Sequence, residues 1–480
     1  MTSEIRVNKI THTTGVGTIT TSADGIVVSG IITANNFSGS IPASNLTGTV
    51  ADARISTLTA SKLSGALPAI SAANLTNLPA ANITGTLPAI DGSALTGVGI
   101  GTDGDVNTSG IITATAFIPS QGQLSHRNLV INGAMNVAQR GTSSTSVGYV
   151  TIDRFNTDYG GENEAMTYTQ ADVSSGTTPY TEGFRKTFKV QNGNQTGGAG
   201  SGDYVFVRTK IEAQDLANSG WNYVSSSSFI TLSFWVKSSV AQTFYGRLES
   251  VDGTSYNYPY SYAVSANTWT KVVKTIPGNS NLQIDNNNGS GMEFHWQIFR
   301  GTNFTDSGVS LDTWATYASG TRTPDATSTW WTTNDATWEL TGVQVEVGSV
   351  ATPFEHKSFI EDKLRCYRYY YKPERGSNVL ELHGQGHHIA DTMGAIVQAY
   401  PWPVEMRATP SLSYDDNNGN SNRFAINGSN NSTTFNVSMS LEPNIQGTMG
   451  GFQYPHGISN ISENESFRLW AYNFSASAEL

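Results

Sequence analysis

The chain has 480 residues, a formal net charge of −11 and one cysteine, Cys366. The acidic balance disfavours a nucleic-acid partner or an electrostatic role at a membrane surface, since both need a basic face, and a single cysteine excludes an intrachain disulfide. Charged residues make up only 14% of the chain, which argues against long surface helices and favours β-structure with many turns, in two or three domains.

The first segment, residues 1–30, is polar and has no apolar stretch of the kind found in secretory signals. No apolar run in the chain is long enough to span a bilayer. We therefore expect neither a secretory signal nor insertion into a membrane.

Residues 31–120 carry a repeat. The segment 63–70 (LSGALPAI) returns twenty positions later as 83–90 (ITGTLPAI). Repetition at a fixed period predicts a stacked or fibrous architecture. Each repeat has few large aliphatic side chains, so one thin chain would lack buried surface, and we expect several identical chains to form an interwoven stalk. A disordered low-complexity linker is the alternative.

Residues 121–356 show strand after strand with turn signals between them. Apolar and polar side chains alternate in 230–236, in 292–298 and in 343–347. Such alternation is typical of an antiparallel sheet that is packed on one face. Several strands of this kind predict a jelly-roll-like β-sandwich of two sheets.

A linking helix is predicted at 357–367. Ser358 and Glu361 form a capping box at its start, and Ile360 and Leu364 follow at helical spacing. This helix should join the sandwich to the last part of the chain.

The last part, 368–480, returns to strands, which we expect within 395–400, 433–441 and 467–480. It predicts a second, C-terminal β-domain. The fold class is therefore mostly β: a fibrous repeat stalk, a β-sandwich and a second β-domain.

Four segments resemble parts of bacteriophage virion proteins. Residues 128–141 (NLVINGAMNVAQRG) resemble the opening of a β-sandwich module of phage tail fibres, and 341–355 (TGVQVEVGSVATPFE) resemble its end. Residues 359–370 look like the helix-to-strand junction that follows this module, and 3–17 are similar to virion-attachment ends in phages of marine cyanobacteria and other aquatic hosts.

The resemblance implies a homotrimeric phage tail fibre, attached to a virion tail or baseplate protein by its N-terminus and assembled in the host cytoplasm. Its distal β-domains would adhere to a host surface polysaccharide or envelope protein. The sandwich also resembles carbohydrate-binding modules, which is an analogy of fold. A structural adaptor, collar or head-fibre protein that docks other virion components is the alternative.

A polysaccharide depolymerase is the less favoured reading. Such enzymes usually place two carboxylates together on a long groove. Here the acidic residues gather at 153–164 and at Glu339 and Glu346 without a recognisable pair. We therefore expect no enzyme activity and no catalytic residue.

Five aromatic residues are the candidate ligand contacts, because aromatic rings stack on the C–H face of a sugar. If Trp330 and Trp331 lie on an extended strand, they point to opposite faces and at most one of them fits the core. Tyr258 and Tyr260 belong to a tyrosine-rich stretch, and Trp402 stands between two prolines, which favours a turn or a sheet edge. Packing without ligand contact is the alternative for each.

No metal or cofactor is expected. His383, His387 and His388 could share an ion near a threefold axis, but a polar turn is the expected reading. One cysteine excludes a zinc-type Cys/His pattern, and no glycine-rich loop has the lysine of a phosphate-binding motif. Residues 415–419 lack the ligand register of a calcium-binding loop.

Overall fold

The structure is a computed structural model. It describes residues 9–11, 18–22, 25–29, 126–373, 379–387, 400–416, 418–428, 435–438, 449–450 and 466–480. The chain divides into two compact units, residues 1–111 and 112–480, and each is described by itself. The repeat region 31–120 lies outside the described residues, so the stalk stays a prediction.

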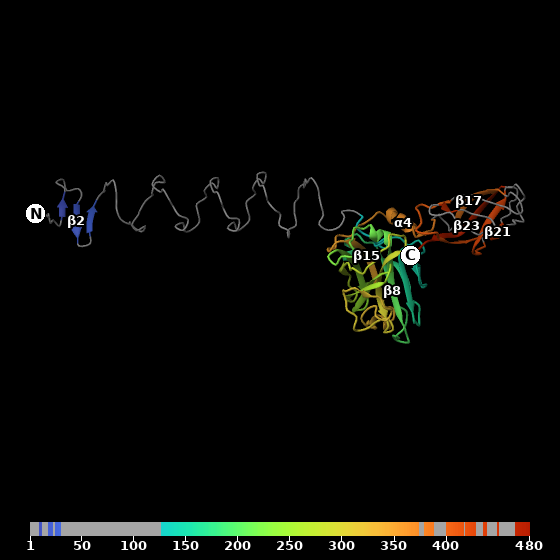
Figure 1. The fold of residues 1–480 in the computed structure, drawn as a ribbon, viewed down its shortest axis with the longest axis horizontal. Coiled ribbons are helices and arrows are strands. Elements are labelled where there is room, and N and C mark those ends of the chain that lie inside the picture. Colours follow the sequence, from blue (N-terminus) through green and yellow to red (C-terminus); the bar gives the residue numbers. More distant parts are fainter. Residues whose placement is uncertain are drawn as a thin grey trace. The chain divides into compact units, whose positions relative to one another are not determined.

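The described residues of the first unit form three short strands (Figure 1). They are β1 (Lys9–Thr11), β2 (Thr18–Ser22) and β3 (Gly25–Ser29), paired antiparallel in the order β1-β2-β3. They lie within the segment 1–30 that we expect to attach to a virion.

The second unit is built on a β-sandwich of two six-stranded antiparallel sheets. The first sheet has the order β14 (Ala315–Thr316), β11 (Tyr256–Val264), β10 (Gln242–Ser250), β13 (Ser290–Arg300), β8 (Tyr204–Glu212), β5 (Phe155–Gly160). The second sheet has the order β12 (Thr270–Pro277), β9 (Phe229–Ser238), β15 (Thr337–Val347), β7 (Lys186–Gln191), β6 (Thr167–Asp172), β4 (Ser143–Ser144). Three short helices connect strands: α1 (Thr178–Thr181), α2 (Ala213–Ala217) and α3 (Thr329–Thr332). The predicted two-sheet sandwich is thus confirmed, and the three predicted strand segments lie in β9, β13 and β15.

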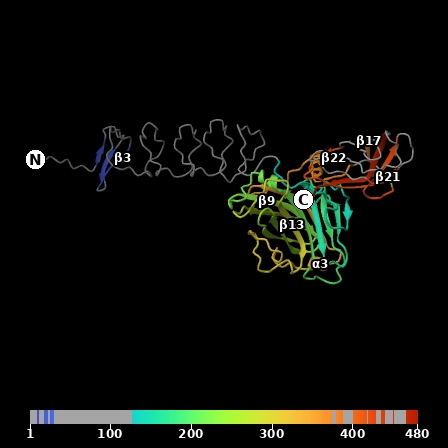
Figure 2. The ribbon, with the colours of Figure 1, turned by 45° about the vertical axis from the view of Figure 1, so that its right-hand side comes forward.

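Aromatic side chains fill the space between the sheets. Figure 2 labels β9 and β13, which belong to the second and the first sheet. Phe234 of β9 and Trp296 of β13 are both buried, and their ring centroids lie 5.7 Å apart. Phe155 of β5 lies 6.2 Å from Trp296. The apolar face of each alternating strand therefore builds one shared core.

The opening and closing motifs of the sandwich meet in space. The side chain of Asn128 donates to the carbonyl of Val343 at 3.0 Å and accepts from the amide of Val345 at 3.1 Å. The amide of Asn128 donates to the Glu355 carboxylate at 2.9 Å. These bonds tie the first residues of the sandwich to β15 and to the segment that follows it.

Gly133 lies against β15 so closely that no side chain fits. A Cβ at this position would lie 2.0 Å from the carbonyl oxygen of Val343, and the amide of Val343 donates to the Gly133 carbonyl at 2.9 Å. Neither backbone segment can withdraw without losing that hydrogen bond.

Gly133→Ala is therefore expected to lower the free energy of unfolding by about 1–3 kcal/mol or more, because the added methyl group overpacks a backbone contact. Urea denaturation measures the change. Gly202→Ala is the control, since Gly202 is exposed and a Cβ there would meet only the Asn303 side chain at 3.6 Å. Equal stability of the two variants would contradict this packing.

Asp153 is a buried carboxyl beside the motif residue Gln139, whose amide donates to it at 3.0 Å. Burial raises the pKa of Asp153 from 3.8 to about 6, although the hydrogen bonds from Gln139 oppose this shift. Between these two pH values the folded chain keeps a proton that the unfolded chain releases. The free energy of unfolding should therefore fall as pH rises through this range.

The expected loss is about 3 kcal/mol between pH 4 and pH 6. Thermal denaturation of the natural chain and of Asp153→Asn across this range measures it, since the asparagine cannot titrate. The variant should gain stability relative to the natural chain as pH rises. Parallel curves would show that Asp153 titrates alike in both states.

The linking helix is confirmed as α4 (Phe359–Tyr367), and the Ser358 hydroxyl accepts from the amide of Glu361 at 3.3 Å. The helix does not bury the apolar side chains Ile360 and Leu364, as an amphipathic helix usually would. Ile360 is 59% exposed and Leu364 is 38% exposed. The helix instead buries Cys366, which packs on a small cluster around Ile131 and Val137, and this contact sets the inner face.

The C-terminal residues form further antiparallel sheet structure. One sheet has the order β16 (Tyr370–Tyr371), β23 (Ser466–Ser477), β20 (Arg423–Gly428), β21 (Phe435–Ser438), and β17 (Val379–His387) and β19 (Ser411–Asp415) also pair with β23. A small sheet pairs β18 (Tyr400–Pro401) with β22 (Met449–Gly450). The predicted strand within 467–480 falls in β23, and that within 433–441 contains β21. Of the segment 395–400 only Tyr400 is described.

Two arginines of the sandwich bind Glu479. The buried side chain of Arg154 forms an ion pair with Glu479, and its guanidinium lies 3.5 Å from the ring centroid of Tyr369. Arg140 pairs with Glu479 at 3.1 Å and lies 3.5 Å from the ring centroid of Tyr370. This cluster ties the penultimate residue, Glu479, to the sandwich. Among the described residues no helix has the length and apolar character needed to cross a membrane.

Candidate binding cavity

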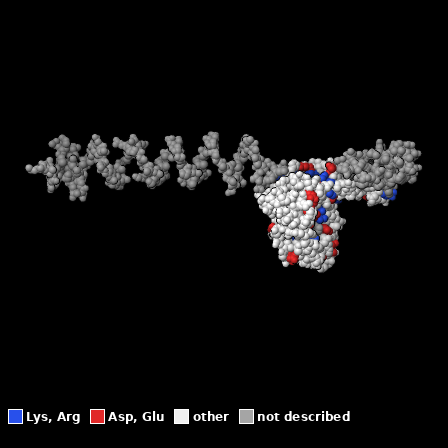
Figure 3. Space-filling model, viewed as in Figure 1, with Lys and Arg blue, Asp and Glu red and all other residues white. Residues whose placement is uncertain are grey.

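Long charged side chains cover the outer face of the first sheet. In the register of the sheet, Arg247 of β10 lies opposite His295 of β13, and His295 lies opposite Arg208 of β8. Glu249 lies opposite Glu293 in the next row. Directly opposed residues share a face, and the residues between them, such as Phe294, point into the core. Figure 3 shows acidic and basic side chains mixed in a band over the region where Figure 1 labels β8.

The segment 301–328 folds over this charged face. Its strand β14 pairs with β11, and the amide of Tyr317 donates to the carbonyl of Ser255 at 2.9 Å. The side chain of Asn257 donates to the carbonyl of Arg322 at 2.8 Å. Because of this cover, His295 and Arg247 are buried even though they lie on the outer side of the sheet.

A cavity of roughly 480 Å³ remains, lined by both the sheet and the covering segment. This volume lies within the range of about 300–1,000 Å³ that small-molecule sites usually have. Its wall combines aromatic and charged side chains. The lining residues are Asp158, Tyr204, Phe206, Arg208, Arg247, Glu249, Glu293, His295, Arg300, Phe304, Tyr317 and Arg322.

Glu293 is ionised and fully paired. It forms ion pairs with Lys210 at 2.8 Å and Arg208 at 3.1 Å, and it lies 2.9 Å from Nε2 of His295. Burial opposes ionisation, but the hydrogen bond with His295 and the charges of Arg208 and Lys210 outweigh it and hold the pKa of Glu293 far below its usual range. Burial, with Arg247 adding to it, lowers the pKa of His295, so the imidazole is neutral at pH 7.

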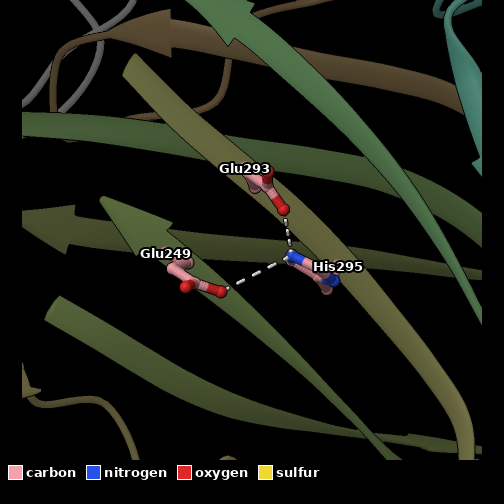
Figure 4. Close-up of side chains that lie close together, drawn as sticks. All are labelled: Glu249, Glu293 and His295. Atoms are coloured by element: carbon pink, nitrogen blue, oxygen red, sulfur yellow. Dashed lines mark hydrogen bonds and ion pairs between the residues drawn. The ribbon is translucent and has the colours of Figure 1, made fainter. Parts of the chain in front are cut away.

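Glu249, Glu293 and His295 form the one group of described residues whose donor atoms could surround a metal ion. Their ligand atoms lie within 4.8 Å of one another, and Figure 4 shows the imidazole nitrogen directed between the two carboxylates. Arg247 already serves as the cation here: it pairs with Glu249, and its Nη2 lies 3.1 Å from Nε2 of His295. A divalent ion would have to displace this guanidinium, so the group fits a salt-bridge cluster better than a metal centre.

Arg300 lies in an aromatic enclosure beside this cluster. Its guanidinium carbon is 4.7 Å from the ring centroid of Phe206 and 5.4 Å from those of Tyr204 and Phe304. Only 6% of the residue is exposed. Burial, with the like charges of Arg322 and Arg247 adding to it, lowers the pKa of Arg300 to about 9, so the guanidinium stays charged at neutral pH.

The two adjacent tryptophans do not line the cavity. Trp330 and Trp331 are both fully buried, and the extended strand on which only one of them would fit the core is not formed. The reason is local: the segment forms α3, labelled in Figure 2, instead of an extended strand. Nε1 of Trp331 donates to the carbonyl of Gly198 at 2.7 Å, and the Asn192 side chain donates to both tryptophan carbonyls, at 3.2 and 2.7 Å.

The other candidate aromatics also pack against protein. Tyr258 and Tyr260 of β11 are 2% and 0% exposed, on the core face of the first sheet. Trp402 is partly buried and stacks on Phe474, with ring centroids 6.2 Å apart. None of the five candidates lines the cavity, and for four of them the structure supports the packing alternative. The side chains of His383, His387 and His388 lie outside the described residues.

The sequence holds one signal for the cavity. The outward-facing positions of β8, β10 and β13 carry Arg, Glu and His together with the rings of Tyr204 and Phe206. The cover by 301–328 has no such signal, because this segment has neither strand alternation nor helical spacing.

A second cavity, of about 220 Å³, lies beside the opening motif. It is smaller than most small-molecule sites. Its wall includes Asn128, which is committed to holding β15, and Arg365 of α4. We therefore treat the larger cavity as the candidate site.

No protein-family model matches the chain, and no curated protein matches it. Among solved structures, the chain is similar to a CBM4 structure at 13% identity over 40% of this chain and 94% of that one, with a TM-score of 0.21. A family 16 carbohydrate-binding module matches at 10% identity over 39% and 89%, with a TM-score of 0.19. The N-terminal cellulose-binding domain of β-1,4-glucanase C from Cellulomonas fimi matches at 12% identity over 45% and 99%, with a TM-score of 0.21. At these TM-scores the sandwich assignment rests on the strand pairing alone.

Proposed function

We propose that the chain is a phage tail fibre or related virion appendage that adheres to a host surface glycan through the cavity on the first sheet. One observation carries the binding proposal: a cavity of roughly 480 Å³ whose wall combines four aromatic rings with charged hydrogen-bonding groups. Sugars combine an apolar C–H face with a polar rim, so a wall of this composition matches both. The virion setting rests on the sequence resemblance.

We propose binding without cleavage. Glu249 and Glu293 lie close enough to suggest a pair of hydrolytic carboxylates. One of such a pair must carry a proton as the general acid. Glu293, however, is held ionised by Arg208 and Lys210, and Glu249 is paired with Arg247. This pairing supports a site that orients a ligand.

Tyr317→Ala is expected to weaken glycan binding by about tenfold or more, because a partly buried aromatic contact is lost from the cavity wall. Binding of the full chain to a panel of bacterial surface polysaccharides, measured by biolayer interferometry, provides the test. Tyr180→Ala is a matched control: its ring also faces a guanidinium, that of Arg185 at 4.0 Å, but lies outside the cavity. A natural chain that binds no glycan in the panel, or equal affinities of the two variants, would contradict the proposal.

We further propose that the appendage is a homotrimer. The twenty-residue repeat needs partner chains to bury its aliphatic side chains, and α4 leaves Phe359 and Ile360 more than half exposed. A second copy of the chain would cover such residues, and three copies would raise avidity. Light scattering on the full chain should give three times the chain mass, and a monomer would overturn the claim.

A structural adaptor is the second candidate. The buried Trp330-Trp331 pair and the exposed apolar side chains of α4 favour it, because an adaptor docks virion proteins through apolar surface. It predicts a chain that binds other virion proteins and no glycan.

A further inference from the structure

On the basis of the proposed function, we propose that the cavity selects a saccharide with a negatively charged substituent, a carboxylate or a sulfate ester, and that Arg300 and Arg322 hold this charge. The inference names the ligand class for the site. Three observations support it: the pairing of charges in the cavity, the buried donors that lack an acceptor, and the aromatic rings around the guanidinium of Arg300.

The charges that line the cavity are unevenly paired. Four arginines face three carboxylates, and His295 between them is neutral. Glu293 is committed to Arg208 and Lys210, and Glu249 to Arg247. Asp158 also lines the wall, but among the ion pairs of the described residues none joins it to an arginine. Among the arginines that line the cavity, Arg300 and Arg322 are therefore the two without a carboxylate at ion-pair distance.

Both arginines carry buried nitrogen atoms without an acceptor. These atoms are Nε of Arg300 and Nη1 of Arg322, and Arg300 is more than nine-tenths buried. A buried donor that lacks a partner is unfavourable, more so when it is charged. These two nitrogen atoms have almost no accessible surface, so an anionic substituent in the cavity would act on the guanidinium groups through its counter-charge and through their other N–H groups.

The aromatic rings restrict how Arg300 can bind a ligand. Phe206, Tyr204 and Phe304 lie around the guanidinium at cation–π distances. The N–H groups that can hydrogen-bond lie in the plane of the guanidinium, where they match the two oxygens of a carboxylate or sulfate. The Nε of Arg322 donates to the hydroxyl of Tyr317 at 3.0 Å, which fixes the second guanidinium in place.

A neutral sugar would leave the buried positive charge of Arg300 without compensation, with the partly exposed charge of Arg322 beside it. A site with buried polar groups discriminates strongly against a ligand that cannot pair with those groups. An apolar site discriminates less against a ligand that fits poorly. We therefore expect the discrimination to come from the charge of the substituent more than from the shape of the ring.

The test compares ligand pairs that differ only in charge, by isothermal titration calorimetry with the full chain. One pair is an oligogalacturonide and its carboxyl-reduced, neutral counterpart, and the other is a sulfated galactan oligosaccharide and its desulfated counterpart. The charged member of at least one pair should bind roughly tenfold to hundredfold more tightly, as expected for hydrogen bonds between charged partners. The two pairs separate carboxylate from sulfate recognition.

Arg322→Gln and Arg300→Gln should each bring the ratio of the affinities for the charged and the neutral member close to one. Arg322 is partly exposed, so its variant keeps the test valid if Arg300→Gln fails to fold. Arg185→Gln, an exposed change of equal charge outside the cavity, is the control. Neutral members that bind as well as charged ones would overturn the inference and leave the proposed function standing. No binding of any saccharide would overturn both.

Discussion

Replacement of Glu479 by glutamine is expected to lower the free energy of unfolding by about 3–5 kcal/mol, the usual cost of removing one partner from a buried ion pair. The side chain of Arg154 is only 1% exposed and that of Glu479 is 9% exposed. Without the carboxylate, Arg154 keeps its hydrogen bond to the carbonyl of Lys210 at 2.9 Å and its contact with Tyr369, but its charge is left uncompensated.

Urea denaturation of the full chain measures this loss. Asp172→Asn is the matched control, because it also removes the carboxylate of an ion pair, that with Lys186 at 2.6 Å, whose side chains are 38% and 80% exposed. An exposed pair contributes at most about 1 kcal/mol. If both variants lose the same small amount, the attachment of the second β-domain does not depend on the Arg154–Glu479 pair.

Trp331→Ala is expected to destabilise the sandwich by about 3–5 kcal/mol, through the cavity left by a fully buried indole. The ring lies 5.1 Å from that of Phe299, and its N–H loses the carbonyl of Gly198 as partner. The variant separates the two interpretations that the sequence allowed. A packing residue affects stability, whereas a ligand contact affects binding.

Trp269→Ala is the control for this substitution, since Trp269 is partly exposed on the sandwich surface. Thermal denaturation should show a much smaller change for it than for Trp331→Ala. A stable Trp331→Ala chain that has lost its glycan affinity would show that the tryptophan, and not the cavity, contacts the ligand.

The sequence predicts the sandwich and the linking helix well because both depend on local periodicity. The alternation in 292–298 places Trp296 in the core, and the capping box at Ser358 marks the start of α4. The structure also explains why the opening and closing motifs occur in one chain, since the amide of Asn128 donates to the carboxylate of Glu355.

The site was not predictable in the same way. Whether Trp330 and Trp331 share a face depends on a single helical turn, which four residues of sequence do not determine. From the alternation alone, Arg247 and His295 are expected to face solvent. Alternation shows on which face of a sheet a residue lies, but it does not show which segment covers that face. The cover comes from a segment that is distant in the chain from β10, and its pairing with β11 is a tertiary contact.

The most direct test of the account is a crystal structure of the chain soaked with the tightest-binding oligosaccharide from the panel. A sugar is expected within the cavity, with one of its rings against Tyr317. Its negatively charged substituent should lie between Arg300 and Arg322. A saccharide bound at Trp402, or elsewhere with the cavity unchanged, would contradict it.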